Sequence, residues 1–266
     1  MRRRRRSASA APAGFVPVAV LAVAFLAVPL MALVVRTPWS RLPEALAAPG
    51  VLTALRLSLV CSVGAVVLSA LLGTPLAWLL ARVSFPGRNV VRALTVMPMV
   101  LPPVVGGVAL LLAFGRQGMV GQWLQQGLGV SLPFTTLGAI VAEAFVAMPF
   151  FVITVEAGLR SMGRRYEDAA ATLGAGRWTT FRRVTLPLMM PSLGAGAALA
   201  WARALGEFGA TITFAGNLPG ATQTMPLAVY LALQTNTDAA IALSLVMLVI
   251  SLVVLVALRA RWFPVR

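Results

Sequence analysis

Histidine and lysine are both absent from the 266-residue sequence, and cysteine occurs once. Without histidine, the chain cannot use an imidazole as an acid, a base or a metal ligand. The lone Cys61 cannot form a disulfide within the chain, and its apolar neighbours favour a small buried side chain. Acids are also scarce, because seven carboxylates face 22 arginines and leave a net charge of +15.

Charged residues of either sign make up only 11% of the chain, whereas 59% of the residues are hydrophobic. The mean hydropathy is +0.90. A soluble domain carries about a quarter charged residues, so this chain has too few charges to cover a water-facing surface. The composition therefore indicates a membrane protein.

Six apolar stretches reach the roughly 20 residues that a helix needs to cross a bilayer. Glu143 interrupts the fourth stretch, and Arg203 and Glu207 interrupt the fifth. The predicted spans are 15–35, 57–80, 93–114, 134–155, 186–214 and 239–258. We expect an all-α integral membrane domain over 15–258, a basic tail at 1–14 and a short tail at 259–266.

The first span is not expected to be a signal peptide. Its 21 apolar residues exceed the roughly 7–15 of a signal sequence, and the small-x-small site at 45–47 lies well beyond them. The five arginines at 2–6 stand beside a membrane span, so a topology signal explains them more simply than a nucleic-acid-binding arm.

The arginines also predict the orientation. With the N-terminus inside, the inner segments hold 17 arginines and the outer segments hold three, Arg36, Arg41 and Arg116. Positive charge is enriched in cytoplasmic loops, so both termini are expected in the cytoplasm. The outer segments 37–50, 115–133 and 215–238 are rich in Gly, Pro, Thr and Gln and are predicted to be turns.

The inner loop 160–185 contains YEDAAATLGAGRWTTFRRVT and is predicted to form short amphipathic helices. Asp168 suits the first turn of a helix, where its charge meets the positive end of the dipole. Ala169 and Ala170 are strong helix formers, and Gly174 can end the helix with a positive φ. On this pattern alone, a loop lying on anionic lipid and a loop that docks another protein are equally supported.

The spacing of this loop resembles the EAA loop of bacterial ABC importer permeases. The matching positions are Asp168, Ala169, Ala170, Gly174, Val184, Leu186 and Pro187, with Asp in place of Glu and Val in place of Ile. The resemblance implies a coupling helix that docks on a separate cytoplasmic ATPase, which uses ATP and Mg. The chain itself has no GxxxxGK[ST] phosphate loop, so it is not expected to bind ATP in that way. The resemblance also implies a permease subunit without a catalytic site, metal or cofactor of its own. Two ATPase grooves imply two permease copies, most simply a homodimer.

The fifth span and its outer loop hold the candidate residues for the translocation path. Arg203 and Glu207 are four residues apart on one helical face, either as a structural ion pair or as part of a path or gate. Small and hydroxyl residues surround them. These residues suit close helix packing, and they also suit a pore whose hydroxyls hydrogen-bond an oxyanion. The full set is Arg203, Glu207, Phe208, Gly209, Thr211, Thr213, Asn217, Thr222, Gln223 and Thr224. No acid lies between Glu207 and Asp238, so an anion would meet donors there.

The stretches GEFGAT and AGN-x-PG-x-TQT-x-PLA-x-Y, with GTPLAWLLAR and MPMVLPPVVG earlier in the chain, resemble the permeases of molybdate importers. The resemblance covers about 55–258. It implies a type I (MetI-like) fold, a periplasmic oxyanion-binding protein as partner, and the bacterial inner membrane as location. Sulfate and thiosulfate permeases are the close alternative. A secondary anion transporter would not need the coupling loop, and an intramembrane enzyme would need clustered reactive groups.

Overall fold

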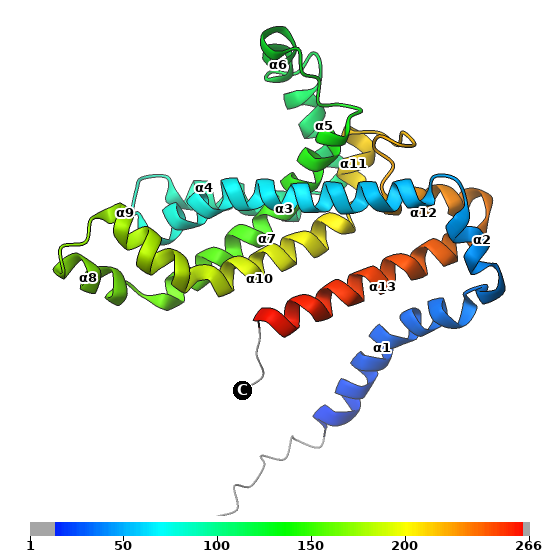
Figure 1. The fold of residues 1–266 in the computed structure, drawn as a ribbon, viewed down its shortest axis with the longest axis horizontal. Coiled ribbons are helices and arrows are strands. Elements are labelled where there is room, and N and C mark those ends of the chain that lie inside the picture. The colour runs from blue at the N-terminus through cyan, green and yellow to red at the C-terminus, as the bar shows by residue number, and fades with distance from the viewer. Residues whose placement is uncertain (1–13, 263–266) are drawn as a thin grey trace, which may run out of the picture.

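The computed structural model describes residues 14–262, and its regular elements there are all helical (Figure 1). The predicted arginine tail at 2–6 and residues 263–266 lie outside the described residues. The helices are α1 Phe15–Arg36, η1 Trp39–Arg41, α2 Leu42–Ala47, α3 Val51–Arg82, α4 Arg88–Val100, α5 Pro103–Phe114, α6 Gly121–Leu128, α7 Thr136–Met162, α8 Arg165–Thr172, α9 Arg177–Thr180, η2 Phe181–Thr185, α10 Leu186–Leu205, α11 Gly209–Phe214, α12 Met225–Thr235 and α13 Thr237–Trp262.

Five segments within 14–262 are long and apolar enough to cross a membrane, and a sixth qualifies if α4 and α5 count together. The five are α1, α3, α7, the segment Arg177–Leu205 and α13. These match the predicted spans in number and order, with different ends. The first helix is 22 residues long, which agrees with a membrane span rather than the core of a signal peptide.

The third predicted span is not a straight helix, contrary to the expectation for 93–114. The helix axis bends by 119° between α4 and α5. Leu101 and Pro102 adopt extended backbone conformations at the bend. The cause is the pair Pro102 and Pro103, because proline disfavours helix in the residue before it and cannot donate the helical hydrogen bond.

The fifth predicted span, 186–214, also differs from a single helix. The helical segment begins earlier, at Arg177, and ends at Leu205. Gly206 to Phe208 leave helical geometry, and α11 restarts at Gly209. The charged pair therefore lies at the end of one helix and the break that follows it, rather than in mid-span.

The outer segments that were predicted to be turns contain helices. They hold α2, α6 and α12, and α12 is 11 residues long and apolar. Pro226 at the start of α12 suits the first turn, where a missing N–H costs nothing. The turn residues Gly216 and Gly220 lie before it, each with a positive φ.

The core lies where α3, α7 and α10 pack along one another. Small residues line the contact, among them Ala65, Ala77, Ala147 and Ala200. Such residues let helix backbones approach closely in a membrane, where van der Waals packing replaces the hydrophobic effect. Gly73 is one such position, because a Cβ there would lie 2.8 Å from the Phe151 ring.

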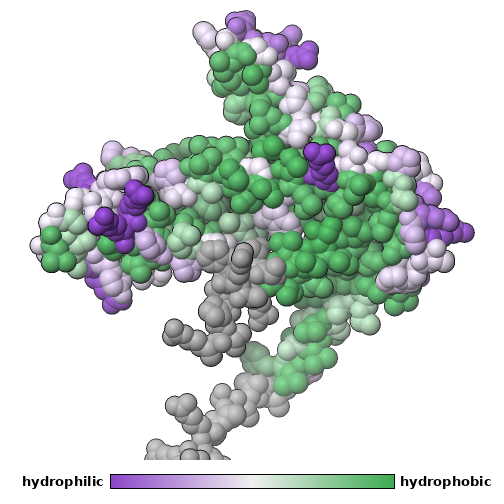
Figure 2. All heavy atoms as spheres, in the orientation of Figure 1, coloured by the Kyte–Doolittle hydropathy of each residue, from purple (hydrophilic) through white to green (hydrophobic). Residues whose placement is uncertain are grey.

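The apolar surface forms a band between two polar ends of the long axis (Figure 2). Helices α8 and α9 lie at one end, and α2 and the start of α13 lie at the other (Figure 1). Every residue of α1 remains exposed or half-buried in the single chain. This arrangement is the one expected for a chain whose middle is surrounded by lipid or by another membrane subunit.

Candidate functional site

Helix α8 and the turn after it form an exposed part of the predicted coupling loop. Glu167 and Asp168 occupy the first turn of α8, as predicted for Asp168. Gly174 has φ +78°, which confirms the prediction that it ends the helix in the left-handed region. The turn is closed by hydrogen bonds from the N–H of Gly174 to Ala171 O and from that of Ala175 to Ala170 O.

The surface of this turn offers apolar and acidic groups to the surroundings. Asp168 and Ala169 are exposed, Ala170 is half-buried, and Leu173 is 88% exposed. Leu173 was not among the predicted residues, although a leucine before a helix-ending glycine is a recognisable signal.

The remaining residues of the predicted loop lead into the membrane helix. Val184 lies in the π-helical segment η2, and Leu186 and Pro187 begin α10. The ring of Trp178 stacks on that of Phe181, with centroids 5.7 Å apart. Helices α9, η2 and α10 follow one another without a break, so a continuous helical segment runs from Arg177 to Leu205 in the core.

Glu167, which was not among the residues predicted from the sequence, connects α8 to two membrane helices. Its Oε1 accepts a hydrogen bond from Arg82 Nε at 3.1 Å and another from Thr185 Oγ1 at 3.1 Å. Arg82 also donates from Nη2 to Gly163 O at 2.8 Å. We call Arg82, Gly163, Glu167 and Thr185 the α8 anchor. The neighbouring Asp168 makes none of these contacts, so Glu167 is the acid that connects α8 to the rest of the chain.

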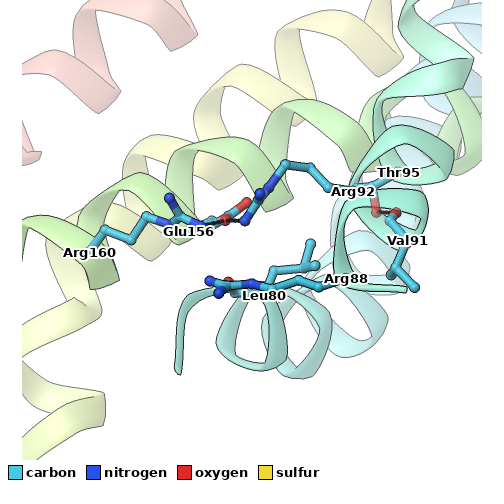
Figure 3. A network of polar contacts seen from close by, with 7 residues as sticks. All are labelled: Leu80, Arg88, Val91, Arg92, Thr95, Glu156 and Arg160. Atoms are coloured by element: carbon cyan, nitrogen blue, oxygen red, sulfur yellow. Dashed lines mark hydrogen bonds and ion pairs between the residues drawn. The ribbon is translucent and has the colours of Figure 1, made fainter. Parts of the chain in front are cut away.

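A second ion-pair network lies at the same end of the molecule (Figure 3). Glu156 of α7 pairs through Oε1 with Arg92 of α4 at 2.7 Å and with Arg160 at 2.9 Å. Arg88 donates to the carbonyl of Leu80, at the end of α3. These contacts join α3, α4 and α7 near the α8 anchor, so the helices at this end are connected to one another by charged groups.

Arg203 and Glu207 form the ion pair that their spacing predicted. Arg203 Nη2 lies 2.5 Å from Glu207 Oε2. The Glu207 side chain is 1% exposed and that of Arg203 is 27% exposed. Glu207 Oε1 accepts a hydrogen bond from the Ala210 N–H at 2.8 Å, so this carboxylate also caps α11.

The residues after the pair pack closely against α5. Gly209 is buried, and a Cβ there would lie 2.8 Å from Pro103 Cβ. The ring of Phe208 contacts that of Tyr230 of α12 in a tilted arrangement, with centroids 5.0 Å apart and an interplanar angle of 53°. Thr211 is fully buried, and Thr213 donates its hydroxyl to Gly209 O at 2.7 Å. The glycine and threonines predicted to line a path therefore sit in helix contacts in the single chain.

The predicted polar turn is folded against the core. Thr222 Oγ1 accepts a hydrogen bond from the Leu218 N–H at 2.9 Å. Thr136 of α7 donates to Ala221 O at 2.8 Å, and the Met225 N–H donates to Ser58 Oγ at 2.7 Å. Thr224 is buried, whereas Asn217 and Gln223 are half-buried. The turn joins α11, α7 and α3, which brings the predicted path residues into one region.

Glu143 of α7 lies near this region as a buried carboxyl. It is 1% exposed, and its Oε2 has no hydrogen-bond partner among the described residues. Ala142, beside it, belongs to the cluster that contains Ala210 and Phe214 of α11. Within residues 14–262, no group of three or more acids and cysteines is placed to hold a metal ion.

The fold and these sites define an integral membrane component of an importer. The family model described as binding-protein-dependent transport system inner membrane component matches residues 73–264, and the chain belongs to this family. The predicted resemblance to ABC importer permeases is thereby confirmed. Members of this family are permease subunits and are not themselves catalytic.

Individual relatives show which permeases of this family the chain is similar to. The chain is 46% identical over 245 residues to the molybdenum transport system permease protein ModB of Mycobacterium tuberculosis, covering 91% of this chain and 92% of that protein. It is 39% identical over 234 residues to the sulfate transport system permease protein CysT of Escherichia coli, covering 86% and 84%. Its fold resembles a crystal structure of a bacterial ABC transporter that imports alginate, with TM-score 0.72, 19% identity and 94% coverage of each chain.

Proposed function

We propose that the chain is the membrane-spanning permease of an ATP-driven importer for molybdate or tungstate. The observation that carries this proposal is the 46% identity to a molybdenum permease over nearly the whole of both chains. The sulfate permease is more distant, at 39% identity, and sulfate or thiosulfate is the second candidate cargo. A secondary anion transporter is not favoured, because the chain belongs to a binding-protein-dependent family.

The chemistry of the outer loop supports an anionic cargo. The segment between Glu207 and Asp238 carries no carboxylate and contains Asn217, Gln223 and several threonines. Arg203 lies just before this segment, and its side chain is 27% exposed beside the buried Glu207. An oxyanion moving past this segment would meet hydrogen-bond donors and a guanidinium.

The exposed α8 turn supports a partner on the ATPase side. Leu173, Asp168 and Ala169 form a small surface that a cytoplasmic ABC ATPase can bury, while the α8 anchor transmits the movement to α3 and α10. ATP and Mg would bind on that ATPase. The other partners in the proposed complex are an extracytoplasmic oxyanion-binding protein, a second copy of this chain and the surrounding lipid.

The cargo is tested by uptake into a bacterial strain that lacks its own molybdate permease. Expression of this chain with its ATPase and binding protein is expected to restore molybdate uptake. A large excess of sulfate should leave most of that uptake intact, whereas tungstate should compete. Uptake that sulfate abolishes and tungstate does not affect would contradict the molybdate assignment and favour the sulfate candidate.

We also propose that α8 and both termini face the cytoplasm, because 17 arginines lie in the inner segments and three in the outer ones. The orientation is tested by labelling intact cells with a membrane-impermeant maleimide. Native Cys61 is fully buried and gives little background. Gln122→Cys on α6 should react in intact cells, and Ser161→Cys beside α8 should react only after the membrane is opened. The reverse pattern would contradict the orientation.

A further inference from the structure

A groove lies between α3 and α9 at the end of the molecule that carries α8. Its walls are Thr74, Pro75 and Trp78 of α3 and Arg177, Trp178 and Phe181, and its volume is about 530 Å³. We call these six residues the interfacial groove. A second hollow of about 440 Å³ adjoins it and shares Trp78, Arg177 and Phe181. That second hollow reaches the α8 anchor.

The groove combines aromatic walls with positive charge. Trp178 is 71% exposed, and Trp78 faces it from α3. Tryptophan at the end of a membrane-spanning helix is typical of the bilayer interface, because the indole has an apolar face and a polar N–H. Arg177 is the one charged residue in the groove, and it makes no ion pair within the described part of the chain.

The charges of the adjoining hollow leave an excess of positive charge. Arg82 is paired with Glu167, so the charges of these two residues cancel. The remaining charged residues of this hollow are two cations, Arg164 and Arg177, and one anion, Asp168. Arg164 donates to the carbonyl of Arg82, which holds its guanidinium at the hollow. The surroundings of the groove therefore favour a ligand with a negative head.

We propose that the interfacial groove binds an anionic phospholipid. Its phosphate would lie beside Arg177 and Arg164, and an acyl chain would run along Thr74, Pro75 and Trp78. Basic pockets between helices at the cytoplasmic face of a membrane bind acidic headgroups for this reason. The inference uses the orientation proposed above and does not depend on which ion the protein transports.

The depth of the groove favours lipid over a soluble partner. Thr74 lies eight residues before Arg82 on the same helix, about 12 Å toward the middle of the span. Pro75 and Thr74 are therefore within the apolar part of α3, which a cytoplasmic ATPase cannot reach. A lipid has both the apolar tail for this wall and the charge for Arg177.

The test is native mass spectrometry of the purified full-length chain with added phosphatidylglycerol. One arginine beside an anionic headgroup contributes about 1 kcal/mol, so Arg177→Gln should lower phosphatidylglycerol affinity about fivefold. Arg182→Gln is the matched control, because Arg182 is exposed four residues after Trp178 and lies outside the groove. The control should bind nearly as the wild type does, and phosphatidylcholine should bind weakly to all three.

A second measurement uses the unaltered protein in vesicles that contain brominated phosphatidylglycerol. Quenching of tryptophan fluorescence should exceed that by brominated phosphatidylcholine, and Trp178→Phe should remove most of the difference. Equal losses from Arg177→Gln and Arg182→Gln, equal quenching by both lipids, or displacement of the lipid by inorganic phosphate would each overturn the proposal. Because the permease alone is used, a failure here is separate from a failure of molybdate uptake.

Discussion

Replacing Arg203 with methionine is expected to destabilise the protein by about 3–5 kcal/mol, because it leaves the buried Glu207 carboxylate without a counter-charge. Thermal unfolding of the purified chain should show the loss as a lower midpoint, and molybdate uptake should fall to near background. Unfolding that is unchanged would show that the ion pair contributes little.

The double variant Arg203→Met/Glu207→Gln separates folding from transport. Glutamine keeps the Oε1 atom that accepts the Ala210 N–H, so the cap of α11 is retained while both charges are removed. Removing a whole buried pair is close to neutral for stability, so the thermal midpoint should recover. Uptake is expected to stay low if the pair belongs to the anion path. A double variant that transports as well as the wild type would make the pair purely structural.

Replacing Glu167 with alanine is expected to uncouple the ATPase from transport. The change removes the acceptor shared by Arg82 and Thr185, so Glu167 no longer connects α8 to α3 and to the start of α10. Changes along a coupling route alter coupling by about 0.5–2 kcal/mol, a factor of roughly 2 to 30. We expect uptake per ATP hydrolysed to fall about tenfold. Glu44→Ala is the control, since Glu44 lies on α2 at the opposite end.

Features that depend on local spacing were predictable from the sequence. The positive φ of Gly174, the first-turn position of Asp168 and the Arg203–Glu207 pair all follow from rules that act within one helical turn. The number and order of the apolar spans follow from hydropathy alone. The family was predictable from a spaced motif, because the positions from Asp168 to Pro187 match the EAA loop of ABC importer permeases.

Features that depend on distant partners were not predictable in this way. Glu167 sits beside Asp168 in the sequence, and only the packing of α8 on α3 selects it as the partner of Arg82. The pairing of Glu156 with Arg92 likewise joins residues from two helices. The bend at Pro102 could have been foreseen, since two successive prolines break a helix, but hydropathy averaged over the stretch concealed it.

The central claim is that the exposed α8 turn receives movement from an ATPase and that the α8 anchor passes it to the membrane helices. The most direct test is to measure molybdate uptake and ATP hydrolysis together in vesicles that contain the complete transporter. In the wild type and in Glu44→Ala, molybdate-loaded binding protein should stimulate both activities. In Glu167→Ala, hydrolysis should persist with little stimulation while uptake falls. Equal uptake per ATP in Glu167→Ala and the wild type would contradict the account.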